Sequence, residues 1–552
     1  MECVKNNRIF LAAAVFAAVL AMYWPCRRFS FVRLDDQDYV YQNTHIRDGL
    51  TSECAEWAFR DVGYASNWHP LTWMSLAADV SLSRWLGLDV SNGVGTAWTS
   101  ESGALPGIMH LHNAVLHAMN AALLVWLIAA VCGKSGVFVA LAALAWAVHP
   151  LRCEAVCWVS ERKELLAVFF MLSAFVLYMR LGRWCYLLSL GCFVLALLSK
   201  PVAVSLPVAL MGYDLGIRRE KFVRVALRMV PFAAFTFVVC LVTLGAQKEA
   251  LDVGDAVSGW GMRIVTAMQA PAVYLWQTVW PAGLCVLYPT HDGVVWPYFI
   301  AGLVLLAAMG WVVWRWLLHG DRWSGLGIFA AGWCYAGLVP MLGLVKVGGQ
   351  PHSDRYTYWV GCGIVVVTSL LGKQVSAFFS QRGKRWALGV LVATVAMYGF
   401  AGTVRAGAWR NSLSLYADAV EKTSDEESAL ILADEMCRLG ADGKNAAVRM
   451  LGKVLSIRKT PKSRGGLALF MAMHCGTVRG VSLVEARMLA ERALEDDPGC
   501  GEAYAALGFA DIAEGKRPQA AERFRAAFSH GYINSRIEAQ IESGKFDGEN
   551  GK

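Results

Sequence analysis

The feature that most constrains the fold is a series of long apolar runs separated by short polar stretches. A membrane-spanning helix needs about 20 predominantly apolar residues. About eleven runs are long enough or nearly so, and they lie at 9–25, 107–131, 137–150, 164–181, 184–199, 200–216, 229–247, 295–317, 325–345, 357–372 and 386–403. The 552 residues are 56% hydrophobic and only 17% charged, which also departs from the composition of soluble domains. The sequence therefore predicts an all-α, polytopic membrane helix bundle over residues 1–403.

One further stretch, 263–281, is apolar but carries Arg263, Gln269, Pro271 and Gln277. Polar groups are costly against lipid, so we expect an amphipathic helix that is interfacial or re-entrant. The alternative is a twelfth crossing, which would reverse the orientation of everything that follows.

Basic residues predict the orientation of the bundle. They gather on one predicted side of the spans, at Lys5, Arg8, 218–228, Arg315, Arg322 and 372–385. The positive-inside rule makes this side cytoplasmic and puts the long, net acidic loop 26–106 outside. A cleaved signal peptide is an alternative for the N-terminal run, and it would leave that loop outside. We expect a bacterial inner membrane, with the loop facing the periplasm.

Charge and cysteine usage exclude other classes. The net charge of +8 is scattered over short loops, which does not indicate nucleic-acid binding. The 15 Cys are spread through apolar runs without CxxC or Cys/His spacing, so they predict neither a zinc site nor a disulfide framework.

Residues 404–552 have a different composition, rich in Ala, Glu, Arg and Lys at helical spacing. Ala486 and Ala520 are 34 residues apart, as are Ala493 and Ala527, which is the period of tetratricopeptide repeats. We expect about three degenerate repeats forming a soluble α-solenoid on the outer side. An Ala-rich helical hairpin without repeat identity is the alternative.

The first outside loop opens with "LDDQDY", which places Asp35, Asp36 and Asp38 just beyond the first span. A solvated loop with a helix N-cap is the plain interpretation. The alternative is catalytic, because a partly desolvated carboxylate beside a like charge has a raised pKa that suits a general base. Further along the loop, "NWHPLTW" adds His69, which fits either an aromatic interface belt or the floor of a polar cavity.

Polar residues recur on one face of the run 107–131. His110, Asn113, His117 and Asn120 are spaced by three, four and three residues. Such a face must meet other helices or a wet cavity. Either the four side chains hold helices together, or His110 and Asn113 line an active-site cavity. A divalent metal bound by these His and the Asp pair is a further alternative, which the spacing does not require.

Cations and carboxylates concentrate in later segments on the outer side. Arginine is well shaped to hold a phosphate, whereas snorkelling to lipid headgroups is the plain alternative for each basic residue. The candidate residues are Glu154, Arg162 and Lys163 in the turn 149–164, Lys200 at a span junction, and Asp354, Arg355 and Tyr356 in the loop 345–359. This inventory fits a reaction at the lipid surface in which a phosphate leaves and a hydroxyl attacks.

The chain resembles a known family through a co-linear set of strings. These are "LDDQDYVYQN", "NWHPLTWMS", "HLHNAVLHAMNAALL", "HPLRCEAVCWVSERKELL", "SKPVAVSLPVAL" and "LVKVGGQPHSDRYTYW", followed by the C-terminal repeats. The set looks like the transmembrane and tetratricopeptide-repeat O-mannosyltransferases and their bacterial homologues, which have the C-type membrane glycosyltransferase fold. The likeness covers nearly the whole chain, although the repeats here are few and degenerate.

The resemblance implies a polyprenyl-phosphate sugar donor and inverting transfer to a hydroxyl of a protein or glycan. By position, Asp35 would be the base and Asp36 its orienting partner, or the reverse. Arg355, with Arg162, Lys163 and Lys200, would hold the departing phosphate, and the repeats would hold an acceptor protein. A ligase or polymerase of the O-antigen type using a lipid diphosphate glycan, a transporter, and a non-catalytic scaffold are the other hypotheses.

Overall fold

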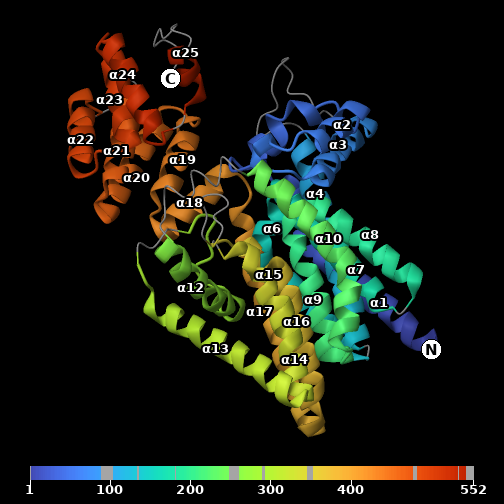
Figure 1. Cartoon of the computed structure of the whole chain (residues 1–552). Helices are drawn as coiled ribbons and strands as arrows, with labels where there is room; N and C mark the ends of the chain where they lie inside the picture. The colour runs from blue at the N-terminus through green and yellow to red at the C-terminus, as the bar shows by residue number, and fades with distance from the viewer. Residues whose placement is uncertain are drawn as a thin grey trace. The chain divides into compact units, whose positions relative to one another are not determined.

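The computed structural model describes residues 2–88, 104–133, 136–180, 182–247, 260–288, 293–342, 344, 352–475, 481–532 and 534–542. Every element in these ranges is helical, as the sequence predicted (Figure 1). The chain divides into two compact units, residues 1–411 and 412–552. Helix α17 (Gln381–Ala408) runs past the predicted boundary at 403 and belongs wholly to the first unit.

Within the described residues, seven helical segments are long and apolar enough to cross a membrane. A bent pair, α5 (Val137–Ala147) with Pro150–Cys157, makes an eighth if its two parts form one span. The chain is therefore a multi-pass membrane protein. The seven segments are Asn7–Arg28, Leu105–Cys132, Phe222–Ala246, Trp296–His319, Arg322–Met341, Asp354–Phe378 and Gln381–Ala408.

This count differs from eleven because some apolar runs form shorter elements. Helices α7 (Arg162–Tyr178) and α8 (Arg183–Ser199) each have 17 residues. The run 200–216 breaks into η7 (Pro201–Ser205), α9 (Leu206–Tyr213) and η8 (Asp214–Arg218). Proline begins or closely follows the start of the first two, and it cannot continue a preceding helix without losing a hydrogen bond.

The stretch 263–281 forms most of α12 (Trp260–Val279), a single helix with Pro271 inside it. It does not reach the apolarity of the seven candidate spans. An interfacial placement remains the prediction.

Further helices of the first unit are α1 (Glu2–Tyr23), α4 (Leu105–Cys132), α6 (Cys153–Cys157), α10 (Phe222–Ala246), α13 (Trp296–His319), α14 (Arg322–Ala330), α15 (Ala336–Leu338) and α16 (Thr357–Val375).

Small residues let two of these elements cross closely. A Cβ on Gly216 in η8 would lie 2.1 Å from the carbonyl oxygen of Gly325 in α14. A Cβ on Gly325 would lie 2.3 Å from the carbonyl oxygen of Gly216. Such contact between backbones is how helices gain van der Waals energy in lipid, where burial of apolar surface drives little association.

The long loop 26–106 is folded where the structure describes it. It contains η1 (Trp24–Arg28), η2 (Gln37–Tyr41), η3 (Thr44–Ile46), α2 (Ser52–Arg60), η4 (Tyr64–Ser66) and α3 (Pro70–Trp85). Buried residues of these elements, among them Tyr39 and Trp73, share one core with Met109 of α4 and with Val159. The acidic motif is therefore anchored to the helical bundle.

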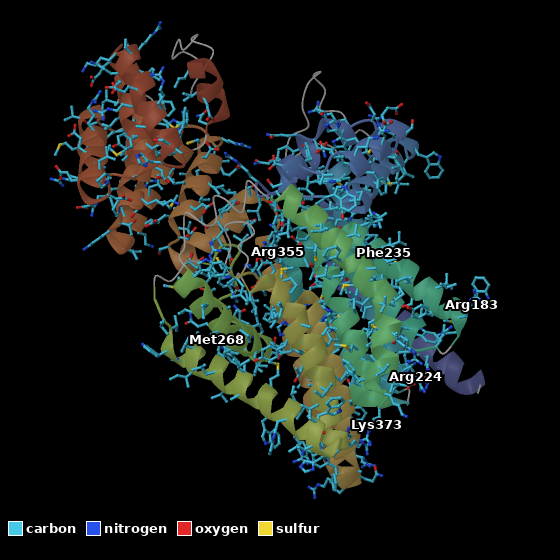
Figure 2. All side chains as sticks on the ribbon, in the orientation of Figure 1. Arg183, Arg224, Phe235, Met268, Arg355 and Lys373 are labelled. Carbon is cyan, nitrogen blue, oxygen red and sulfur yellow. The ribbon has the colours of Figure 1, made fainter. Side chains whose placement is uncertain are left out.

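Basic residues of the predicted cytoplasmic segments lie at the opposite end of the first unit's helices from Arg355. In Figure 2, Arg224 and Lys373 lie toward one end of the helices and Arg355 lies toward the other. The basic segments 218–228 and 372–385 contain the first two residues. This separation is what the positive-inside argument requires, while the side of the membrane that each end faces remains a prediction.

The second unit is a stack of helices around one core. Ala486, Ala493, Ala520 and Ala527, the residues of the predicted 34-residue period, are all buried in that core, on α22 and α24. Repeat identity stays a prediction. The helices are α18 (Ser412–Thr423), α19 (Glu426–Cys437), α20 (Ala441–Arg458), α21 (Pro461–Met473), α22 (Leu483–Asp496), α23 (Gly501–Ala513), α24 (Arg517–Ser529) and α25 (Ser535–Glu542).

Candidate functional site

The two neighbouring aspartates of the acidic motif lie in opposite environments. Asp36 is fully buried, and its carboxylate accepts hydrogen bonds from the Val32 N–H at 2.9 Å, the Ser160 N–H at 2.9 Å and the Ser160 hydroxyl at 2.5 Å. The side chain of Asp35 is 44% exposed, and its Oδ2 lies 3.4 Å from Lys163 Nζ. Asp35 can therefore meet a substrate, whereas Asp36 ties the motif to the segment before α7.

The buried aspartate, Asp36, has a raised pKa. Burial raises the pKa of Asp36 to about 6, against the lowering effect of its hydrogen bonds from Ser160 and Val32. Both oxygens of Asp36 are already used by these donors. A raised pKa here reflects desolvation in the fold, and because Asp36 is fully buried its oxygens are closed to an acceptor hydroxyl.

Three cations converge on one carboxylate, Glu161, and two of them come from segments distant in sequence. Its oxygens lie 2.9 Å from Lys200 Nζ, 3.5 Å from Lys163 Nζ and 3.3 Å from Arg355 Nε. Lys200 also reaches Glu164 at 2.9 Å. We define the ion cluster as these five side chains together with Glu154, which pairs with Arg355.

The electrostatics of Glu161 show how strongly the cations act. Burial raises the pKa of this carboxyl, but Lys200, Lys163 and Arg355 outweigh burial and hold it at about 2. Three carboxylates and three cations balance the cluster in formal charge. Its cations are nearly buried, with the side chains of Lys163, Lys200 and Arg355 only 8%, 10% and 13% exposed.

Glu154 positions the loop that carries Arg355. Its carboxylate accepts from the Ser353 hydroxyl at 2.8 Å and from the Asp354 N–H at 3.0 Å, and it also pairs with the Arg355 guanidinium. Asp354 is buried and accepts a hydrogen bond of 2.5 Å from the Tyr288 hydroxyl. Glu154 and Asp354 are thus positioning residues rather than exposed reactants. Lys346, which belongs to the same predicted loop, lies outside the described residues.

Aromatic rings border the ion cluster. Lys163 Nζ lies 4.2 Å from the centroid of Tyr39, and the Arg355 guanidinium lies 5.2 Å from Trp158. The same guanidinium lies 5.0 Å from the ring of Tyr356. Such contacts stabilise partly desolvated cations.

His69 lies behind this border, with Nδ1 3.2 Å from the Tyr39 hydroxyl. Burial, aided by the nearby charges of Lys163 and Lys200, keeps the pKa of His69 well below its usual range. The ring is therefore neutral at pH 7. It offers one hydrogen-bond donor and one acceptor but no charge.

Arg162 does not join the ion cluster. Its guanidinium is fully buried and donates to Asn113 Oδ1, to Ser75 Oγ at 3.0 Å, to Asp79 Oδ2 at 2.8 Å and to the Met109 carbonyl at 2.8 Å. These partners lie on α3 and α4, so Arg162 fastens α7 to both helices. We therefore leave it out of the phosphate-binding set that the sequence suggested.

The polar face of α4 takes part in packing between helices. His110 Nε2 lies 3.3 Å from the Ser30 carbonyl oxygen, and Asn113 donates to the Trp158 carbonyl at 2.9 Å. His117 and Asn120 both bond the hydroxyl of Tyr358, at 2.6 and 3.1 Å. All four polar residues are fully buried. These contacts favour the interpretation in which this face holds helices together over the one in which His110 and Asn113 line an active-site cavity.

The sequence alone did not single out two features of the site. Glu161 was one charge among several in "WVSERKE", and its central place depends on Lys200 and Arg355, which are distant in sequence. The Asp79–His112 contact at 2.6 Å, which supports Arg162, joins α3 to α4. The weak signal for it is the second histidine of "HLH".

Among the described residues, no three His, Cys, Asp or Glu side chains are arranged to hold a metal ion.

Comparison with known proteins gives limited similarity. No family model matches the chain, and no curated protein matches its sequence. The solved structure of the Archaeoglobus fulgidus oligosaccharyltransferase in its apo form is similar over 92% of this chain and 72% of that one, with 12% sequence identity and a TM-score of 0.39. That similarity is too low to assign roles, so the site is argued from its own residues.

Proposed function

We propose that this chain is a membrane glycosyltransferase that moves a sugar from a polyprenyl-phosphate donor to a hydroxyl of a protein or glycan, on the outer side of the membrane. The observation that carries the proposal is the convergence of Lys163, Lys200 and Arg355 around Glu161, next to the half-exposed Asp35. A half-exposed carboxylate beside preorganised, nearly buried cations suits a reaction that removes a proton and expels an anion.

In the proposed reaction Asp35 accepts the proton of the acceptor hydroxyl. The acceptor oxygen bonds to the anomeric carbon as the bond from that carbon to the phosphate oxygen breaks. The phosphate leaves with the electron pair, and the positive charges of Lys163, Lys200 and Arg355 stabilise its charge. Asp36 acts as a positioning residue, because it joins the motif to Ser160, the residue before Glu161.

The remaining ion cluster has a supporting role in this scheme. Glu161 holds the three cations together before substrate arrives, which reduces the reorganisation needed during the reaction. Glu154 fixes the backbone of the Arg355 loop. The helical second unit would recruit the acceptor protein, as expected of a repeat surface.

The test compares Asp35→Asn with wild type in membranes supplied with radiolabelled polyprenyl-phosphate sugars, and it measures label passed to protein or glycan. Asp38→Asn is the matched control, since Asp38 belongs to the same motif and is exposed. We expect transfer to fall at least about 100-fold in Asp35→Asn and to persist in Asp38→Asn. Unchanged transfer in a folded Asp35→Asn protein would contradict the mechanism, and transfer from diphosphate-linked donors alone would favour the ligase hypothesis.

A further inference from the structure

Two buried thiols from distant parts of the first unit face each other. Cys26 belongs to η1, and Cys157 is the last residue of α6. Their Sγ atoms are 3.6 Å apart although the residues are 131 positions apart in sequence. The tertiary fold therefore brings the two sulfur atoms together, because their chain segments are not neighbours in the sequence.

The separation is within reach of a covalent bond. A disulfide needs its sulfur atoms about 2.05 Å apart, so the gap to close is about 1.5 Å. Rotation about the Cα–Cβ bond moves a thiol sulfur by more than this distance. We propose that Cys26 and Cys157 form a disulfide in the mature protein. The proposal concerns this single pair and is independent of the glycosyltransferase function.

The reaction is a thiol–disulfide exchange with an oxidised dithiol of the outer compartment. Cys26 and Cys157 each lose a proton, the new S–S bond forms, and two electrons reduce the donor disulfide to a dithiol. The orientation predicted from basic residues places this end of the unit in an oxidising compartment, where such bonds persist. Because both thiols are buried, exchange takes place before the helices close around them.

The bond would stabilise the candidate site. Cys26 precedes the acidic motif by nine positions, and Cys157 is adjacent to Trp158, whose ring lies against Lys163 and Arg355. A covalent link would therefore fix the segment that enters the motif to the segment that carries Glu154 and Glu161. Neither segment could separate from the other during local opening of the loop.

The experiment is peptide mapping of the full chain from native membranes. Free thiols are alkylated under denaturing conditions, and one half of the sample is then reduced and treated with a second alkylating reagent. Trypsin releases Cys26 in the peptide 9–27 and Cys157 in the peptide 153–162, which also contains Cys153. We expect these two peptides to be linked before reduction and to carry the second reagent on Cys26 and Cys157 after it.

Three variants identify the partner. The linked peptide should vanish in Cys26→Ser and in Cys157→Ser but remain in the matched control Cys153→Ser, which changes a buried thiol on the same helix. Full alkylation of Cys26 and Cys157 before reduction in wild type would overturn the proposal. A link that survives Cys157→Ser but disappears in Cys153→Ser would overturn it too, because the partner would then be Cys153.

Discussion

Replacing Arg162 by Lys separates a role in the fold from a role in binding phosphate. The guanidinium is fully buried and donates to groups on both α3 and α4. Lysine keeps the positive charge near Asp79, but its single ammonium cannot span the same acceptors as the planar fork of arginine. At least one buried acceptor, the side-chain oxygen of Asn113, would lose its donor, and the carbonyl of Met109 would keep only the hydrogen bond within its own helix.

The magnitude follows from that acceptor. A buried polar group left without its hydrogen bond costs about 1–3 kcal/mol, so Arg162→Lys should lower the free energy of unfolding by about 1–3 kcal/mol. Denaturant titration of the purified full chain in detergent micelles, followed by Trp fluorescence, measures this change. The control is Arg84→Lys, whose side chain is 45% exposed and whose change should stay within about 0.5 kcal/mol.

A second readout decides between the two roles. If Arg162 belongs to the fold, the folded fraction of Arg162→Lys should keep its KM for the lipid-phosphate donor. Wild-type stability together with a raised donor KM would refute the structural reasoning, and it would return Arg162 to the phosphate-binding set.

Three other predictions concern buried groups. Burial raises the pKa of Asp36 from 3.8 to about 6, so the folded chain holds that proton more tightly than the unfolded chain, and wild type loses stability as pH rises through this window. Asp36→Asn does not titrate. Between unfolding titrations at pH 4 and at pH 7.5, the free energy of unfolding of Asp36→Asn should therefore gain about 3 kcal/mol relative to that of wild type. Lys200→Met removes a main cause of the lowered pKa of Glu161 and should cost about 3–5 kcal/mol at pH 7. Stability from this lowered pKa is present above about 4.5 and is lost as pH falls through about 2, so an equal cost at about pH 2 would contradict the ion-cluster argument. Gly216→Ala places a Cβ 2.1 Å from a backbone oxygen of α14 and should cost about 1–3 kcal/mol by denaturant titration, whereas Gly245→Ala, which meets nothing within 4 Å, should not.

Much of the architecture could be predicted from the sequence because lipid imposes a local requirement. A run such as 295–317 must satisfy its backbone hydrogen bonds internally, and a helix does so without knowledge of its neighbours. Structure confirms an all-helical chain in the described ranges, with α13 covering that run. Helix ends were harder to predict. The run 200–216 was predicted as a span, yet its prolines divide it into short pieces.

The candidate site could be predicted only in part, because burial depends on contacts between distant segments. Asp35 and Asp36 are equivalent in sequence, but Ser160, 124 positions away, takes Asp36 into the interior. Adjacent cations in "SERKE" also separate, since Arg162 and Lys163 begin a helix and point to different partners. One position along a helix turns a side chain by about 100°, enough to place one residue in the fold and the next in the ion cluster.

The sequence by itself thus determined that this chain is helical, that it crosses a membrane, and which polar residues gather in the segments between its apolar runs. Those properties follow from the composition and spacing of residues within each segment. Tertiary structure alone decided that Asp35 is exposed while Asp36 is buried, that Lys163, Lys200 and Arg355 meet at Glu161, and that Cys26 faces Cys157. Each of these depends on distances between segments far apart in the chain, which packing of the helices sets and local sequence does not encode.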